Sequence, residues 1–431
     1  MLNNEYFTLL KPKKMNKMKK LTPIILLFIC FNLAAQQKND YTRSSLHLHL
    51  VDDFDYENGD YVLNSYEKFE FPENYNDHTI DFRKVKLSDF ELTDAEKDIA
   101  GEGNNALGNM ATSVVENSTS GVIELPNNSL VKLQLDKYIK ENKIAHELIK
   151  KWWNIQNDGG FNTDLVNFRS IQNLSEETKK LAAVSGSGSI NQFNGLISNT
   201  FLVFTRLNYV SNKIVAESIR QVAYETLQKL PGFAQSSATK AADKIYEKTS
   251  EGYSVWTTSW LYQLEWDKIL YKEFVSTISE NKKIDLNKFN KINFQLNYLD
   301  QEKVTSLVTF SLKKSDKDRT KQDVFDLATI RNMDKVLVKL QKNNDVFKPI
   351  FPLQEGFAIA AGTKEGIEGG DKFEVLETKD GEYNRIGKMK IDEKKIWDNS
   401  WNSEDIKPGL TYFKKGSKKY IPGIHYVRLI K

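Results

Sequence analysis

Two histidines near the N-terminus have the spacing of a metal site. His47 and His49 lie in Ser45–Val51, where residue types alternate, so we expect a strand with both imidazoles on one face. Two histidines on one strand face are more often structural or solvent-facing than metal ligands. The chain has no H-E-x-x-H sequence either, because Lys150 stands where His146-Glu147 would need a second histidine. We therefore predict no metal site.

A glycine–serine loop is the second place where chemistry could occur. Gly186-Ser187-Gly188 lies between a predicted helix and a predicted strand, and Asn191 stands where a dinucleotide fingerprint needs its third glycine. That fingerprint also requires the opposite order of elements, since pyrophosphate binds at the N-terminus of the helix that follows the loop. No nucleophile elbow or carboxylate pair in an apolar setting stands out. We predict no cofactor, no catalytic residues and no enzyme activity.

Residues 1–37 have the pattern of a signal peptide. A lysine-rich start precedes the apolar run Ile24–Phe31, and Leu33–Gln36 supplies small residues for cleavage at Ala35, Gln36 or nearby. The apolar run is too short to cross a bilayer as a helix. The residues before the lysine-rich part add nothing that a signal needs, so translation can equally begin at Met15 or Met18.

The single cysteine and the charge also point to export. Cys30 lies inside the leader and follows Ile29, where a lipoprotein signal needs a small residue. The mature chain then lacks thiols, which excludes disulfides and cysteine nucleophiles. Residues 1–37 contain six lysines and one glutamate, so most of the positive charge behind the net value of +3 belongs to the leader. The mature chain is nearly neutral, which gives no reason to expect nucleic-acid binding. We expect the periplasm or outer-membrane periphery of a Gram-negative bacterium.

The remaining chain divides into three parts. Residues 38–128 are predicted to be a β-rich region followed by a Gly-, Asn- and Ser-rich linker, residues 129–348 an α/β domain, and residues 349–431 a small β-barrel of short strands with glycine-rich turns. The fold class is α+β or α/β, with a central domain that resembles a three-layer arrangement and contains an insertion.

Within the central domain, periodicity and breaker residues mark the elements. A helix ends at Asn157–Gly160, Phe161–Ile171 is predicted to be extended, and Thr200–Phe204 is predicted to be a strand buried on both faces. The later elements are predicted at these positions: helices over Ser211–Ser250 broken at Pro231-Gly232, strands at Tyr253–Trp266, Ile292–Tyr298 and Val304–Leu312 with a turn at Asp300-Gln301, and a helix at Asp323–Lys342.

One predicted strand carries an aromatic stripe. Trp256, Trp260, Tyr262 and Trp266 recur with a period of two, so they share one face of the strand at Tyr253–Trp266. Such rings are costly to leave in water. They can cover the domain core, meet a partner or second copy, or sit at a membrane interface. We take these four residues as the candidate interaction surface.

Two segments resemble proteins of the bacterial envelope. Ile144–Arg206, with Gly160-Phe161-Asn162 before Arg169, is similar in its order of elements to the periplasmic α/β domain of the curli-secretion family. Ala361–Val375, which contains Gly-Ile and then Gly-Asp-Lys-Phe-Glu-Val, resembles the small C-terminal barrel attached to such domains in flagellar ring proteins. The resemblance implies a non-enzymatic assembly or scaffold protein.

The expected function is therefore a structural or assembly role in the envelope, through contacts with itself or with other envelope proteins. An envelope hydrolase whose site only the fold assembles and a component of an outer-membrane secretion pore are the alternatives. The basic cluster Lys414, Lys415, Lys418 and Lys419 is either a solvated loop or a contact with an anionic envelope polymer or lipid headgroup.

Overall fold

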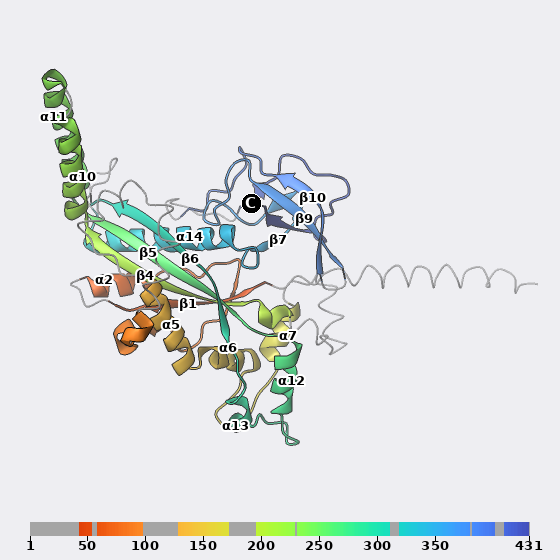
Figure 1. Cartoon of the computed structure of the whole chain (residues 1–431). Helices are drawn as coiled ribbons and strands as arrows, with labels where there is room; N and C mark the ends of the chain where they lie inside the picture. The colour runs from red at the N-terminus through yellow and green to blue at the C-terminus, as the bar shows by residue number, and fades with distance from the viewer. Residues whose placement is uncertain are drawn as a thin grey trace, which may run out of the picture.

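The protein is an α+β structure built on a mixed sheet, seen here in a computed structural model (Figure 1). The structure describes residues 43–53, 58–97, 128–171, 195–228, 231–310, 319–379, 382–400 and 409–430. The expected leader, the linker before residue 128 and the glycine–serine loop lie outside these residues. The main sheet has the order β2-β1-β4-β5-β6, and β3 also pairs with β1. Its strands are β1 (Ser45–Val51), β2 (Asn76–Asp77), β3 (Lys84–Val85), β4 (Thr200–Ser211), β5 (Tyr253–Leu264) and β6 (Leu296–Val308).

The predicted strand at Ser45–Val51 is confirmed as β1, and it lies inside the main sheet. It pairs in parallel with β4, with His47 opposite Leu202 and His49 opposite Phe204. All of its residues are buried. The boundary expected at residue 128 therefore does not separate two cores, because the N-terminal region contributes an inner strand to the sheet of the α/β domain.

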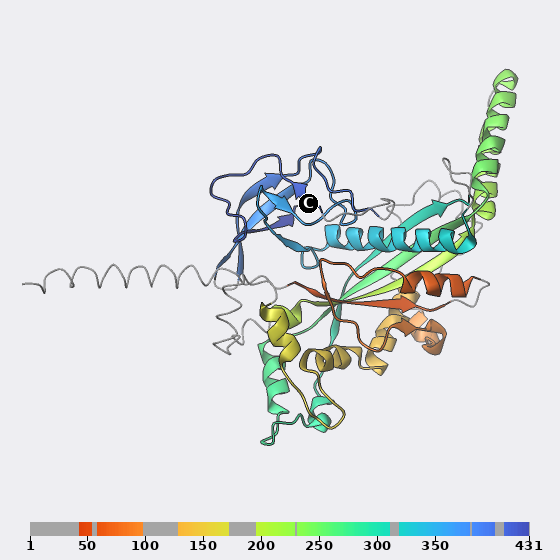
Figure 2. The ribbon, with the colours of Figure 1, turned by 180° about the vertical axis from the view of Figure 1, so that it is seen from behind.

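Helices cover both faces of this sheet (Figures 1 and 2). One face packs against α5 (Asn128–Glu141), α6 (Ile144–Trp153), α12 (Lys268–Ser276) and α13 (Leu286–Phe289). The other packs against α2 (Gly59–Glu67) and α14 (Lys321–Asn343). Alternation along β1 separates the two cores, since Leu46, Leu48 and Leu50 face α14 while the histidines face α5. A short 3₁₀ helix, η1 (Leu87–Asp89), follows β3.

Two predictions near the sheet are wrong. Phe161–Ile171 is not an extended segment, because Asp164–Ile171 forms the helix α7, with Val166 on its buried side and an aspartate at its N-terminus. The turn expected at Asp300-Gln301 does not form. β6 runs through it as one strand, with a bulge at Leu299 because Leu261 and Tyr262 of β5 pair with Asp300 and Tyr298.

The insertion between β4 and β5 is a helical hairpin that confirms the predicted break. α10 (Asn212–Leu227) and α11 (Gly232–Thr249) are separated at Pro231, and they project from the end of the sheet as an arm (Figure 1). The arm starts and ends at neighbouring positions, because Ser211 pairs with Tyr253 across the two strands. It can therefore extend without disturbing the ladder between β4 and β5.

The C-terminal part has its own apolar cluster, and its strand ladders do not confirm the expected small barrel. A four-stranded sheet has the order β10-β9-β12-β7, β11 pairs with β8, and the isolated bridges Gln354–Ala358 and Ile391–Phe413 link the two sheets. These strands are β7 (Ile350–Pro352), β8 (Ala358–Ile359), β9 (Lys372–Lys379), β10 (Glu382–Lys390), β11 (Thr411–Tyr412) and β12 (Tyr426–Leu429). Short strands were expected in this part, whereas a barrel depends on pairings between distant segments that short strands do not specify.

Candidate functional site

The aromatic stripe of β5 is buried within the chain. Trp260 and Tyr262 are 0% and 1% exposed, and Trp256 and Trp266 are 5% and 6% exposed. The Tyr262 hydroxyl donates to Asp136 Oδ1 of α5 at 2.8 Å. These four side chains are therefore core residues and not an exposed interaction surface, which corrects our expectation. The physical reason for Trp260, Tyr262 and Trp266 is that α5, α6 and α12 cover this face of the sheet.

The paired histidines of β1 share one face, as predicted, and they are fully buried. His47 Nε2 lies 2.7 Å from the Phe82 carbonyl oxygen, and the His49 ring packs 4.7 Å from the ring of Phe204. Burial lowers the pKa of His47 to about 4 and that of His49 to about 3. Within the described residues, no group of three or more His, Cys, Asp or Glu side chains could hold a metal ion.

A buried polar network that the sequence analysis missed joins β1 to α6 and α7. Arg169 is 5% exposed, and its guanidinium donates to Ser45 Oγ at 2.9 Å and to the Asp77 carbonyl oxygen. It also lies 4.8 Å from the ring centroid of Trp152, whose indole N–H donates to Thr200 Oγ1 at 2.9 Å. Burial lowers the pKa of Arg169 to about 10, so it stays charged at neutral pH. This network links the starts of β1 and β4 and has a structural role.

A cationic groove of about 560 Å³ lies between α14, β6 and the C-terminal part. The largest share of its lining comes from one face of α14, where residues recur at helical spacing: Arg331, Asp334, Lys335, Val338, Lys339 and Lys342. Val304 and Thr305 of β6 form one side. A loop from Thr363 to Glu368 forms the opposite side. The helical spacing of these polar residues is visible in the sequence, but the sequence does not show which segment covers the helix.

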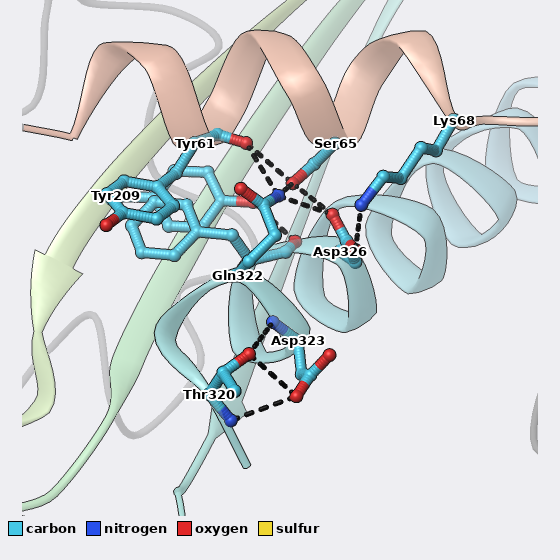
Figure 3. A network of polar contacts seen from close by, with 9 residues as sticks. Tyr61, Ser65, Lys68, Tyr209, Thr320, Gln322, Asp323 and Asp326 are labelled. Carbon is cyan, nitrogen blue, oxygen red and sulfur yellow. Dashed lines mark hydrogen bonds and ion pairs between the residues drawn. The ribbon is translucent and has the colours of Figure 1, made fainter.

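α14 is held firmly in place at its start. Thr320 caps the helix through a reciprocal capping box with Asp323, in which Thr320 N donates to Asp323 Oδ2 at 2.9 Å. Asp326 accepts from Ser65 Oγ of α2 at 2.8 Å and from Nζ of Lys68, the residue that follows α2, at 2.7 Å (Figure 3). This contact fixes the helix against the N-terminal part, so the groove residues further along it project from a rigid support.

The groove wall from the C-terminal part approaches α14 closely at Gly366. This residue has φ +71°, and a Cβ atom there would lie 2.4 Å from Val338 Cγ1. Lys342 pairs with Glu368 across the groove at 3.2 Å, and Lys364 pairs with Glu70 at 3.2 Å. The small residue thus allows the loop to pack on the helix while the ion pairs hold its two ends.

The groove has an uneven charge. Five of its lining residues are basic: Arg331, Lys335, Lys339, Lys342 and Lys364. Only Asp334 and Glu368 are acidic. Burial raises the pKa of Asp334 to about 7, with Lys364 opposing the shift and Glu365 and Glu70 adding to it. At neutral pH this carboxyl is therefore less ionised than that of an ordinary aspartate, and basic side chains outnumber acidic ones in the lining.

The arm is held together by a small polar cluster of its own. Tyr224 of α10 donates to the Asp243 carboxylate of α11. Arg220 lies 3.8 Å from the same carboxylate and places its guanidinium 4.0 Å from the ring centroid of Tyr246. α11 packs on α10, and α10 contacts β4 and β5 at the base of the arm. The arm therefore keeps a defined shape away from the body of the protein.

The lysine cluster near the C-terminus is exposed and lies in the loop after β11. Lys414 pairs with Glu393 at 2.9 Å, and Lys419 donates to the Ile386 carbonyl oxygen at 2.9 Å. These contacts fit a solvated loop, and contact with an anionic polymer or headgroup stays a prediction. Within the part of the chain that is described, no helix combines the length and apolar character needed to cross a bilayer.

Comparisons with models of protein families, with curated proteins and with solved structures found no match to this chain. The likeness of Ile144–Arg206 to the curli-secretion domain and of Ala361–Val375 to a flagellar ring barrel therefore remains an expectation from the sequence.

Proposed function

We propose that this protein is an exported, non-enzymatic assembly component of a bacterial cell envelope that acts through protein–protein contacts, and that the arm formed by α10 and α11 makes the principal contact. The arm is the observation that carries this proposal. It adds 38 residues between two neighbouring inner strands, and it extends from the body instead of covering the core (Figures 1 and 2).

The energetics of a helical hairpin support a contact role. Two helices of this length bury one face against each other and leave most of their surface in water, so they gain little stability from the body of the protein. Ile214 and Ile245 are 43% and 57% exposed on the arm. Such an arm is expensive to order unless it binds something, and partners in envelope assembly include a second copy of this chain or another envelope protein.

The geometry allows a clean test of the arm. Asn212 N donates to the Gly252 carbonyl oxygen at 3.0 Å, so residues 213–251 can be replaced by an Asn-Gly turn that closes β4 and β5 as a hairpin. We expect the mature chain to associate in sedimentation velocity and the armless chain to sediment as a monomer with an unchanged melting temperature. Equal association of the two chains, or a strictly monomeric intact chain, would contradict self-association through the arm.

A separate experiment tests whether the protein is exported. Osmotic release of the periplasm should yield the processed chain without its leader. Retention of the unprocessed chain in the cytoplasm would contradict the proposed place of action.

A further inference from the structure

The cations of the groove are only partly neutralised by the protein. Lys342 and Lys364 each have a carboxylate partner at 3.2 Å. Lys339 Nζ donates to the Lys303 carbonyl oxygen at 2.7 Å and lies 3.9 Å from the Glu302 carboxylate. Lys335 has no carboxylate within 4.0 Å among the residues that the structure describes. It lies one turn after Arg331 on the same helix face, where like charges repel.

The electrostatic setting of these two residues favours an added negative charge. Burial and the neighbouring charge of Arg331 lower the pKa of Lys335. Burial and the charge of Arg319 lower the pKa of Arg331. The surroundings of both side chains therefore disfavour their positive charges. An anion placed between Arg331 and Lys335 would reduce the repulsion between them.

From this arrangement we propose that the groove between α14, β6 and the C-terminal part is a binding site for a small, multiply charged anion. Its volume of about 560 Å³ suits a small molecule. Lys335 and Lys339 offer point charges one turn apart, and Arg331 adds a positive charge one turn before them. Val304 and Val338 provide limited apolar contact. The chemistry shared by possible ligands is two or more phosphate or carboxylate groups.

Asp334 makes this site sensitive to pH. Asp334 shares the groove lining with the cations of α14, and Lys364, Glu365 and Glu70 of the other elements act on its carboxyl. As pH rises through about 7, Asp334 becomes a carboxylate and removes one unit of positive charge from the groove. We expect anion affinity to fall by about fivefold across this range, in line with one added like charge at contact distance in water.

Calorimetric titration of the mature chain in a low-salt buffer without phosphate tests the site. Pyrophosphate and citrate are the probes, because they distinguish a preference for phosphate from one for carboxylate. We expect saturable binding of at least one of them. The double variant Lys335→Gln/Lys339→Gln should weaken it by about tenfold or more. Asp334→Asn should retain binding and lose its pH dependence.

A matched control separates the groove from general surface charge. Lys268 and Lys272, at the start of and within α12, are exposed and have the same spacing as Lys335 and Lys339. Lys268→Gln/Lys272→Gln should leave probe affinity unchanged. Equal weakening by both double variants, or no saturable binding of either probe up to about 10 mM, would overturn the proposal. Binding to phosphatidylglycerol vesicles without binding of either probe would also overturn it, because the lysines would then serve a membrane surface.

Discussion

Arg169 Nη1 lies 2.8 Å from His78 Nδ1, and both side chains are buried. Because a guanidinium can only donate, Nδ1 of His78 must accept, and the ring proton therefore resides on Nε2. Nε2 lies 2.9 Å from the Leu148 carbonyl oxygen, to which it donates. Burial and the charge of Arg169 hold the pKa of His78 well below its usual range. The pair thus fixes one neutral tautomer and links α7 to the sheet and to α6.

Replacing Arg169 by Met should destabilise the fold. The substitution leaves His78 Nδ1 and Ser45 Oγ without their charged donor in a buried setting, which costs about 2–4 kcal/mol of unfolding free energy. Urea unfolding measures the loss, with Arg43→Met as a control because Arg43 makes an exposed hydrogen bond to the Glu73 carbonyl oxygen. Equal stability of the two variants would show that the buried network contributes nothing specific.

Acid should destabilise the protein through its buried histidines. His47 and His146 have pKa values lowered to about 4 by burial, whereas the unfolded chain protonates them near 6.5. The unfolded state therefore binds more protons between these values, so stability is full above about pH 6.5 and falls as pH drops towards 4. His47 alone accounts for a loss of up to about 3 kcal/mol.

Urea unfolding at a series of pH values tests this linkage. His47→Gln removes one titrating group, so the variant should show a shallower decline below about pH 6.5, whatever its stability at neutral pH. A slope that the substitution leaves unchanged would mean that His47 does not stay neutral in the folded chain.

Replacing Trp260 by Ala should destabilise the monomer without changing its association state. The indole is fully buried in the core between the sheet and α5, so its removal leaves a cavity and costs about 3–5 kcal/mol. Ile269→Ala is the control, because Ile269 is 66% exposed and should change stability by less than about 0.5 kcal/mol. Loss of association with an unchanged melting temperature would instead show that Trp260 lies in an interface between subunits.

Gly366→Ala should loosen the C-terminal wall of the groove. The new Cβ would meet Val338, and the residue would also keep a left-handed conformation, so we expect a loss of about 2–4 kcal/mol. Gly423→Ala separates the two effects, because Gly423 has φ +78° but no atom within 4 Å of the added Cβ. It should cost only about 1–2 kcal/mol.

A second substitution tests the contact between the Gly366 loop and Val338. Val338→Ala should recover part of the loss in the Gly366→Ala background, since it removes the atoms that clash. The comparison uses thermal melts of Gly366→Ala, Gly423→Ala, Val338→Ala and the Gly366→Ala/Val338→Ala double variant. Additive losses would show that the loop does not rest on Val338.

Local pattern was enough to predict most elements. The alternation at Tyr253–Trp266, the break at Pro231-Gly232 and the apolar face of Asp323–Lys342 depend on near neighbours in the chain, so they predicted β5, the two helices of the arm and α14. α7 was missed because a short helix of eight residues has too few turns to show a clear period.

The sequence by itself determined which residues must leave water, and only the tertiary structure decided what covers them. Period two placed Trp260 and Tyr262 on one face, but a core and an interface bury aromatic rings for the same physical reason. Helices far along the chain cover them, and β1 joins β4 across about 150 residues. The cationic face of α14 likewise becomes a groove only because Gly366 brings a distant loop against Val338. Pairing and packing between distant segments depend on the whole fold, which no local period encodes.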